Sequence, residues 1–325
     1  MLLRLIRLAA LTAGTAGGVS GAAYGVLNGQ SWYARRLIGE PEDLPLRADG
    51  TYLPDGTGPL ERAELLDPAQ PRDRTASPDA GRGEVLELAV LGDSSAAGLG
   101  VDRPDELPGV LLARGLAAEI ERPVRLTTHA VVGTTSRELS AQVEAVLAAP
   151  PRLAMVLIGA NDVTSQLRVS TCAALLGDAV ARLTAAGIDL VAGTCPDLGA
   201  VRPIPQPLRA VARSWSLALG RAQRRAVEQA GGHAVPLADL LAPEFLARSG
   251  ELFSPDRYHP SAAGYEAVAN ILLPELCSAI GEWEGGPLPS LPTRSATAEA
   301  RRPTSRLVAH LNRRLRRSAR DGGRV

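Results

Sequence analysis

Short apolar runs recur along the middle of the chain, and each is followed by a longer segment with helical spacing of its apolar residues. The first run, at residues 85–91, is apolar at nearly every position and ends at Gly92. Runs of this kind are typical of strands buried on both faces of a parallel sheet. We predict five such strands, at residues 85–91, 124–132, 153–158, 188–192 and 233–236.

The segments between the runs repeat apolar residues with the helical period. The predicted helices cover residues 108–120, 136–147, 172–186, 208–230 and 261–280. Alternating strands and helices with short connections are typical of a parallel sheet between two helical layers. We therefore predict a three-layer α/β/α sandwich with a parallel sheet of about five strands. Ligands of such folds bind beyond the carboxyl ends of the strands.

Both ends of the sequence lack this alternation, so we divide the chain into four parts. Residues 1–28 contain a charge-free run from 8 to 27 after two arginines, which predicts a membrane anchor or a signal peptide. Residues 29–83 are acidic and proline-rich, and we interpret them as a linker. Residues 84–282 form the predicted α/β domain, and residues 283–325 form a basic tail.

The N-terminal segment leaves the location of the protein open. Trp32 and Tyr33 follow the apolar run as aromatic residues do at a membrane interface, which favours an uncleaved anchor with the domain on the outer face. Cleavage after Ala22 would instead give a secreted protein. A third reading is a weakly apolar helix packed on the protein, because the run is rich in glycine.

Charge is balanced over the chain, with 35 Lys and Arg against 35 Asp and Glu, but the tail is strongly basic. As a helix the tail would be amphipathic and suited to anionic lipid or nucleic acid, and as a disordered segment it would be solvated. For the protein as a whole we expect a membrane contact and no nucleic-acid partner. Its oligomeric state is left open.

Cysteines and histidines give no sign of a metal site. Cys172, Cys195 and Cys277 lack C-x-x-C spacing, and the four histidines show no zinc-binding pattern, so we expect no metal. In an exported protein Cys172 and Cys195 could pair, and the alternative is that all three are buried free thiols.

Ser94 stands just past the first predicted strand, within Gly92-Asp93-Ser94-Ser95. A strand-to-helix turn there would expose the hydroxyl and place its backbone N–H at a helix start, where negative charge is favoured. The residue is therefore a candidate nucleophile. The alternative is a serine that only caps the following helix.

His259 is the candidate base because it alone among the histidines has an acid one helical turn upstream, Asp256. A carboxylate at this spacing can reach Nδ1, fix the tautomer and stabilise the imidazolium. In the alternative reading, Asp256 and Ser261 are caps of the last helix.

Gly133 and Asn161 follow the second and third predicted strands and are candidate hydrogen-bond donors. The backbone N–H of Gly133, the side-chain amide of Asn161 and the N–H of Ser94 would together form an oxyanion hole. Each residue also has a purely structural interpretation. Gly133 could belong to a turn that needs positive φ, and Asn161 to a turn that its own side chain stabilises.

In these four blocks the chain resembles the SGNH hydrolases, also called GDSL-type esterases. The resemblance covers roughly residues 84–280 and places the family's named residues on Ser94, Gly133, Asn161 and His259, with Asp256 as the triad acid. Ser95 departs from the pattern, because the signature usually has leucine there. The resemblance implies a flavodoxin-like fold, no cofactor, and cleavage of carboxylic esters through an acyl-enzyme on Ser94.

The substrate is less determined than the chemistry. Aromatic residues make up only 3% of the chain, which favours a small or lipid-like ester over a polysaccharide. The proline-rich stretch at residues 196–207 is a candidate lining of the acyl pocket. Two alternative functions are considered. One is an acyltransferase that uses the same triad, and the other is a non-catalytic surface-binding protein. A dinucleotide-binding module is disfavoured because the glycines after residue 91 do not fit G-x-G-x-x-G.

Overall fold

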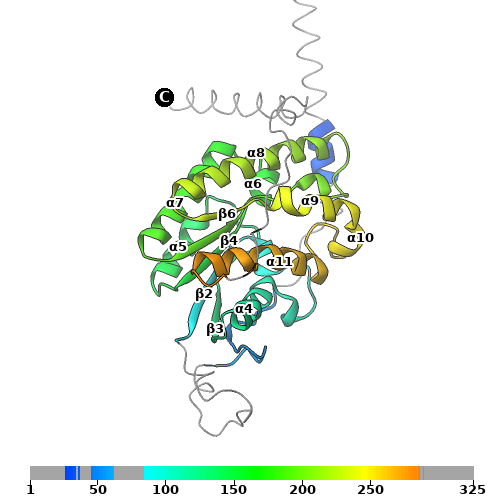
Figure 1. Cartoon of the computed structure of the whole chain (residues 1–325). Helices are drawn as coiled ribbons and strands as arrows, with labels where there is room; N and C mark the ends of the chain where they lie inside the picture. Colours follow the sequence, from blue (N-terminus) through cyan, green and yellow to red (C-terminus); the bar gives the residue numbers. More distant parts are fainter. Residues whose placement is uncertain are drawn as a thin grey trace, which may run out of the picture.

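A computed structural model describes residues 26–33, 36, 45–61, 84–283, 285 and 288. Six strands form one sheet in the order β1-β3-β2-β4-β5-β6 (Figure 1). Strands β2 to β6 are parallel, and β1 pairs antiparallel with β3 at the edge. The strands are β1 (Gly50–Tyr52), β2 (Leu86–Gly92), β3 (Val124–Thr128), β4 (Leu153–Leu157), β5 (Asp189–Gly193) and β6 (His233–Val235). The sheet is thus mostly parallel, as predicted, with one further strand.

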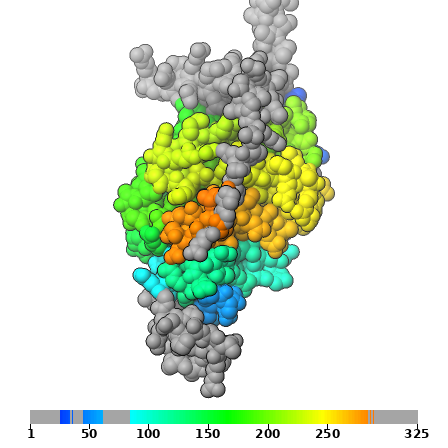
Figure 2. All heavy atoms as spheres, in the orientation of Figure 1, coloured from blue at the N-terminus to red at the C-terminus, as the bar shows by residue number. Residues whose placement is uncertain are grey.

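Helices cover both faces of the sheet, which gives the predicted three layers. The longer ones are α4 (Pro108–Glu119), α5 (Leu139–Leu147), α7 (Val169–Ala185), α8 (Leu208–Gln229), α9 (Leu237–Ala247) and α11 (Ala262–Ala279). The shorter ones are α3 (Ser94–Ala97), η1 (Pro104–Glu106), α6 (Ala160–Thr164), η2 (Leu198–Ala200) and α10 (Ser249–Leu252). Helices α4, α9 and α11 form much of the surface seen in Figure 2.

Alternate residues of β2 face the two helical layers, and this builds two separate apolar clusters. Leu88 and Val90 belong to the cluster that includes residues of α4, α9 and α11. Ala89 and Leu91 belong to the other, which includes residues of α5 and α7. Because both faces are buried, the strand reads as a continuous apolar run in the sequence.

Part of the segment predicted as a linker is instead built into the domain. Strand β1 lies within it, and the Tyr52 side chain is fully buried in the cluster with α4. The Tyr52 hydroxyl donates a hydrogen bond of 2.5 Å to the carbonyl of Ala48. The linker prediction is wrong for residues 45–61, because burial of this ring and pairing with the free edge of β3 stabilise an ordered segment.

Residues 26–33 form a helix, drawn in blue in Figure 1, that docks near the start of α8. The Gln30 side chain donates to the carbonyl of Gln206 (2.5 Å) and accepts from the Leu208 N–H (3.0 Å). Trp32 and Tyr33 on this helix are exposed. Most of the predicted anchor and of the basic tail lies outside the described residues. No helix within the described ranges has both the length and the apolar character needed to cross a bilayer.

Candidate active site

The turn after β2 brings Ser94 to the first position of α3. Gly92 has φ of 135°, and a Cβ on it would lie 1.9 Å from the carbonyl oxygen of Leu157, so only glycine fits there. Asp93 then caps α3, because its carboxylate accepts the Ser95 N–H at 2.9 Å. The capping role that we considered for Ser94 is therefore filled by Asp93, and the Ser94 side chain takes part in a different contact.

That contact is with His259, which lies on the loop between α10 and α11. His259 Nε2 is 3.0 Å from Ser94 Oγ, and His259 Nδ1 is 2.6 Å from Asp256 Oδ2. Ser94 and His259 are both buried. The structure thus joins three residues of the sequence-based hypothesis in the order hydroxyl, imidazole, carboxylate, across a separation of 165 positions between Ser94 and His259.

The loop that carries Asp256 also satisfies the second oxygen of its carboxylate. Asp256 Oδ1 accepts hydrogen bonds from Ser254 Oγ (2.7 Å) and from the backbone N–H groups of Tyr258 (2.7 Å) and His259 (2.9 Å). Burial acts to raise the pKa of Asp256, but the hydrogen bonds from His259, Ser254 and the backbone outweigh it and hold the pKa well below its usual range. The carboxylate therefore stays ionised next to the imidazole.

Gly133, on the loop after β3, and Asn161, in the first turn of α6, lie at the same end of the sheet as Ser94. The Val131 N–H donates to the carbonyl of Gly92 at 3.1 Å, which holds the loop after β3 beside the end of β2. Gly133 has φ of 82°, and nothing lies within 4 Å of the position that a Cβ would take. Asn161 Nδ2 donates to the carbonyl of Thr134 at 3.0 Å, which ties the start of α6 to the turn at Gly133. The Asn161 amide carries a second N–H.

Asp162 has a role in this region that the sequence interpretation missed. Its two carboxylate oxygens accept hydrogen bonds from the Ser136 N–H (2.8 Å) and the Ser136 hydroxyl (2.6 Å). Asp162 is fully buried, and burial raises its pKa. This contact clamps the loop after β3 to α6, the short helix that follows β4. The sequence shows only that Asp162 follows Asn161, and this does not identify Ser136 as its hydrogen-bond partner.

The cysteines do not pair. Cys172, Cys195 and Cys277 are buried free thiols, and burial raises the pKa of each. The pairing that we considered for Cys172 and Cys195 is therefore absent. In the parts of the chain that the structure describes, no group of three or more His, Cys, Asp or Glu side chains is arranged to hold a metal ion.

Comparison with known proteins identifies the family of this chain. Residues 90–267 match the sequence model of the GDSL-like Lipase/Acylhydrolase family. The chain is 42% identical over 285 residues to the GDSL-like esterase Rv1075c of Mycobacterium tuberculosis, a match that covers 86% of each chain. Two solved structures with similar folds are TesA, 23% identical over 60% of this chain and 98% of that one with a TM-score of 0.47, and a lipase/acylhydrolase from Enterococcus faecalis, 20% identical over 60% and 96% with a TM-score of 0.49.

A serine beside an imidazole and a carboxylate at the carboxyl end of an α/β sheet is typical of serine hydrolases, and the matches to esterases give the class of protein, a carboxylic ester hydrolase. Within this class the chain belongs to the GDSL-like lipase/acylhydrolase family. Family membership confirms the predicted resemblance and the predicted enzyme class. It also argues against a non-catalytic surface-binding protein.

Proposed function

We propose that this enzyme hydrolyses a small or lipid-like carboxylic ester through an acyl-enzyme on Ser94. The observation that carries the proposal is the distance of 3.0 Å between Ser94 Oγ and His259 Nε2, with Asp256 on the other side of the imidazole. A serine hydroxyl is a weak nucleophile on its own, and a base within hydrogen-bond reach activates it.

The proposed cycle has two steps. Ser94 Oγ attacks the acyl carbon while its proton moves to His259 Nε2, and the imidazolium then donates that proton to the leaving alkoxide. A water molecule next loses a proton to His259 and attacks the acyl-enzyme, which releases the acid and restores Ser94. Asp256 holds the proton on Nδ1 throughout and stabilises the imidazolium. No cofactor enters either step.

The negative oxygen formed in each step needs donors, and three are assigned in this proposal. They are the Ser94 N–H at the start of α3, the Gly133 N–H and the second N–H of the Asn161 amide. Support comes from the open space at Gly133 and from the hydrogen bond that fixes the Asn161 amide to Thr134. Helix α3 has only four residues, so the positive end of its dipole is weak. The Gly133 N–H and the Asn161 amide are therefore assigned most of this stabilisation.

The direct test is labelling with a fluorophosphonate, followed by fragmentation of the modified peptide. We expect the label on Ser94 and on no other serine, and we expect Ser94→Ala to lose both labelling and cleavage of p-nitrophenyl acetate. Ser170→Ala, an exposed serine of α7, is the matched control and should retain both. Labelling of Ser95, or full turnover by Ser94→Ala, would contradict the proposal.

Hydrolysis and acyl transfer share the first step and differ in what attacks the acyl-enzyme. We assign water as the acceptor. Adding a primary alcohol during turnover distinguishes the two reactions, because a transferase would convert most of the acyl group to a new ester at low alcohol concentration. Release of free acid as the main product supports the hydrolase.

We further propose that the N-terminal segment anchors the enzyme at a membrane, with the catalytic domain on the outer face. The charge-free run up to residue 27 leads into the helix of residues 26–33, whose exposed Trp32 and Tyr33 suit a lipid interface. Fractionation of the full chain against a form lacking residues 1–25 tests this, because that form keeps the Gln30 contacts. Recovery of the full-length chain in the soluble fraction would contradict the anchor, and recovery there of a shorter form with a new N-terminus would support cleavage and secretion.

A further inference from the structure

The strand that leads to Ser94 loses one of its neighbours before it ends. In the ladder between β2 and β3 the last pair is Val90 with Thr128, so no residue of β3 lies opposite Gly92. The Val131 N–H, on the loop after β3, donates to the Gly92 carbonyl at 3.1 Å. The Gly92 N–H is left to find an acceptor elsewhere, because a buried backbone donor without a partner costs free energy.

The side chain of Gln142 supplies that acceptor. Gln142 Oε1 accepts the Gly92 N–H at 2.7 Å, and Gln142 Nε2 donates to the Gly92 carbonyl at 2.9 Å. Gln142 belongs to α5 and is buried. A backbone N–H can only donate and a carbonyl can only accept, so these two contacts fix the orientation of the amide. The side chain therefore takes the place that a residue of a neighbouring strand would have.

The same amide reaches the turn that carries Gly133. Gln142 Nε2 makes a longer contact of 3.4 Å with the hydroxyl oxygen of Thr134, the residue after Gly133. The carbonyl of Thr134 accepts the hydrogen bond from Asn161. Gln142 thus lies between the turn that positions the serine and the turn that positions two of the proposed oxyanion donors.

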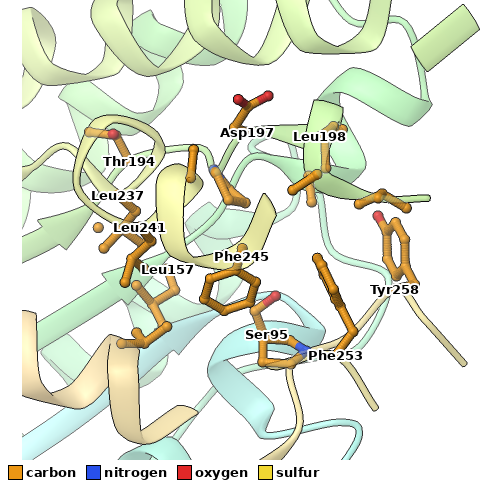
Figure 3. A pocket seen from close by; sticks show the side chains of 18 of the residues that line it. Ser95, Leu157, Thr194, Asp197, Leu198, Leu237, Leu241, Phe245, Phe253 and Tyr258 are labelled. Atoms are coloured by element: carbon orange, nitrogen blue, oxygen red, sulfur yellow. The ribbon is translucent and has the colours of Figure 1, made fainter. Parts of the chain in front are cut away.

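The other face of the sheet offers the Ser94 turn few polar partners. A cavity on that face borders the turn at Ser95 and is lined mostly by apolar side chains, among them Leu241 and Phe245 of α9 (Figure 3). Helices α9 and α5 pack on opposite faces of the sheet. Polar support from the helical layers therefore comes from the α5 side, through Gln142.

We propose that Gln142 is a positioning residue for ester cleavage, which fixes the nucleophile turn relative to the oxyanion donors. The inference rests on the proposed function, because it takes Ser94 as the nucleophile and the Gly133 N–H as a donor. The hydrogen bonds of Gln142 go to Gly92 and Thr134 and not to the triad. Its effect is therefore indirect.

Loss of the amide should affect the transition state more than the bound substrate. The oxyanion exists only after the serine has attacked, so the distance between serine and donors matters mainly in that step. A misplacement of about 1 Å can cost about 10²-fold in rate. The expected signature is a fall in kcat with little change in KM.

The test replaces Gln142 with methionine, which has a similar length and no amide. We expect kcat for p-nitrophenyl acetate to fall by about 10–100-fold, with KM changed by less than about threefold. Thr184→Val is the matched control, because it removes a hydroxyl that donates to the Ala230 carbonyl at 3.0 Å. Thr184 and Ala230 precede β5 and β6, at the opposite end of the sheet, so this variant should keep the wild-type kcat.

Gln142→Glu is the second variant and decides the question if Gln142→Met does not fold. An ionised glutamate can accept the Gly92 N–H but has no proton for the Gly92 carbonyl, whereas the protonated acid can make both contacts. The ratio of variant to wild-type kcat should therefore fall as the pH rises from about 5 to about 8, since burial moves the pKa of a glutamate upward into this range. The ratio for Gln142→Met should not depend on pH.

The titratable and charged groups around these turns are common to wild type and variant, so their own titration cancels in the ratio. They include Asp93, Arg137, Glu138, Asp162, Cys172 and His259.

An unchanged kcat in both Gln142 variants would overturn the inference while leaving Ser94-dependent ester cleavage in place. A loss confined to KM, or an equal loss of kcat in Thr184→Val, would overturn it as well. A pH-independent ratio for Gln142→Glu would do the same. Absence of Ser94 labelling in the wild type would instead remove the proposed function itself.

Discussion

Asp256 uses its two carboxylate oxygens for different purposes. Oδ2 lies 2.6 Å from the imidazole, and Oδ1 accepts three hydrogen bonds from within its own loop. Arg257, between the acid and the base, has φ of 58°, a left-handed conformation that is uncommon for a residue other than glycine. The loop is therefore shaped around the carboxylate, which fixes the direction in which the imidazole points.

Replacing Asp256 with asparagine keeps the volume of the side chain and removes its charge. We expect Asp256→Asn to lower kcat/KM by roughly 10³–10⁴-fold, as loss of the orienting acid does in serine proteases. Asp105→Asn removes a carboxylate on the exposed surface and serves as the control in the same steady-state assay. A decrease of less than about tenfold for Asp256→Asn would show that the acid does not stabilise the imidazolium.

Asp93 presents the opposite electrostatic case. Burial raises its pKa to about 6, although hydrogen bonds from the backbone of Ser95 and Gly159 act to lower it. In the unfolded chain an aspartate has a pKa of about 3.9. The folded protein therefore holds this proton more tightly than the unfolded chain, and the resulting stabilisation is present below about pH 4 and is lost as the pH rises through about 6.

The expected consequence is a pH dependence that Asp93→Asn removes. The contribution of Asp93 should lower the free energy of unfolding by on the order of 2–3 kcal/mol between pH 4 and pH 7. Asparagine keeps an oxygen that can accept the Ser95 N–H. The measurement is urea unfolding of both proteins across this range, and the difference between them isolates Asp93 from other carboxyl groups. A difference independent of pH would contradict the assignment.

At the scale of elements, the site depends on contacts between segments that follow different strands. The Asp162 clamp on Ser136 and the Asn161 bond to Thr134 join the loop after β3 to α6, the helix after β4. Two of the three proposed oxyanion donors lie on these two segments. The relative position of the Gly133 and Asn161 donors therefore depends on the buried Asp162 carboxylate, whose hydrogen bonds go to Ser136 and not to Ser94.

Ser136→Ala tests this positioning role, because it removes the hydroxyl hydrogen bond to the buried carboxylate of Asp162. We expect the free energy of unfolding to fall by about 1–3 kcal/mol. We also expect kcat to fall by about tenfold with KM little changed, since the donors act mainly in the transition state. Ser140→Ala, on the exposed side of α5, is the control. A loss of stability with unchanged kcat would limit the clamp to a structural role.

Most elements of the domain could be predicted because each carries a clear period. The five central strands and the helices corresponding to α4, α5, α7, α8 and α11 lie where the apolar pattern placed them, with ends shifted by a few residues. Helix α9 was missed because its sequence is apolar almost all round and contains Pro243, which is unusual inside a helix. Strand β1 was missed because three residues are too few to show alternation.

At the scale of the whole molecule, the sequence indicated the polar residues of the site and one segment of the apolar cavity near them. Residues 196–207 were the expected lining of an acyl pocket, and Pro196, Leu198 and Val201 line this cavity. Ser94, Asp256 and His259 belong to short motifs, and the ends of parallel strands necessarily meet at one edge of the sheet. The cavity depends on how α9 and α11 pack over the ends of β4 and β5. No local pattern in the sequence specifies that packing.

The segment before β2 contributes to the stability of the whole domain. We expect Tyr52→Ala to lower the free energy of unfolding by about 3–5 kcal/mol, because it empties a fully buried aromatic site. Tyr33→Ala, at an exposed tyrosine, should change it by no more than about 0.5 kcal/mol. Urea unfolding of the two full-length variants gives the comparison. Equal values would mean that residues 45–61 rest on the domain without stabilising it.

Strands β1 and β6, at the two margins of the sheet, span only three residues each. A margin this short offers few free N–H and C=O groups for another polypeptide to extend the sheet. The long, apolar central strands, which would pair readily with other chains, are enclosed between these margins. The folded domain is thereby protected from joining its neighbours into extended aggregates, even at high local concentration.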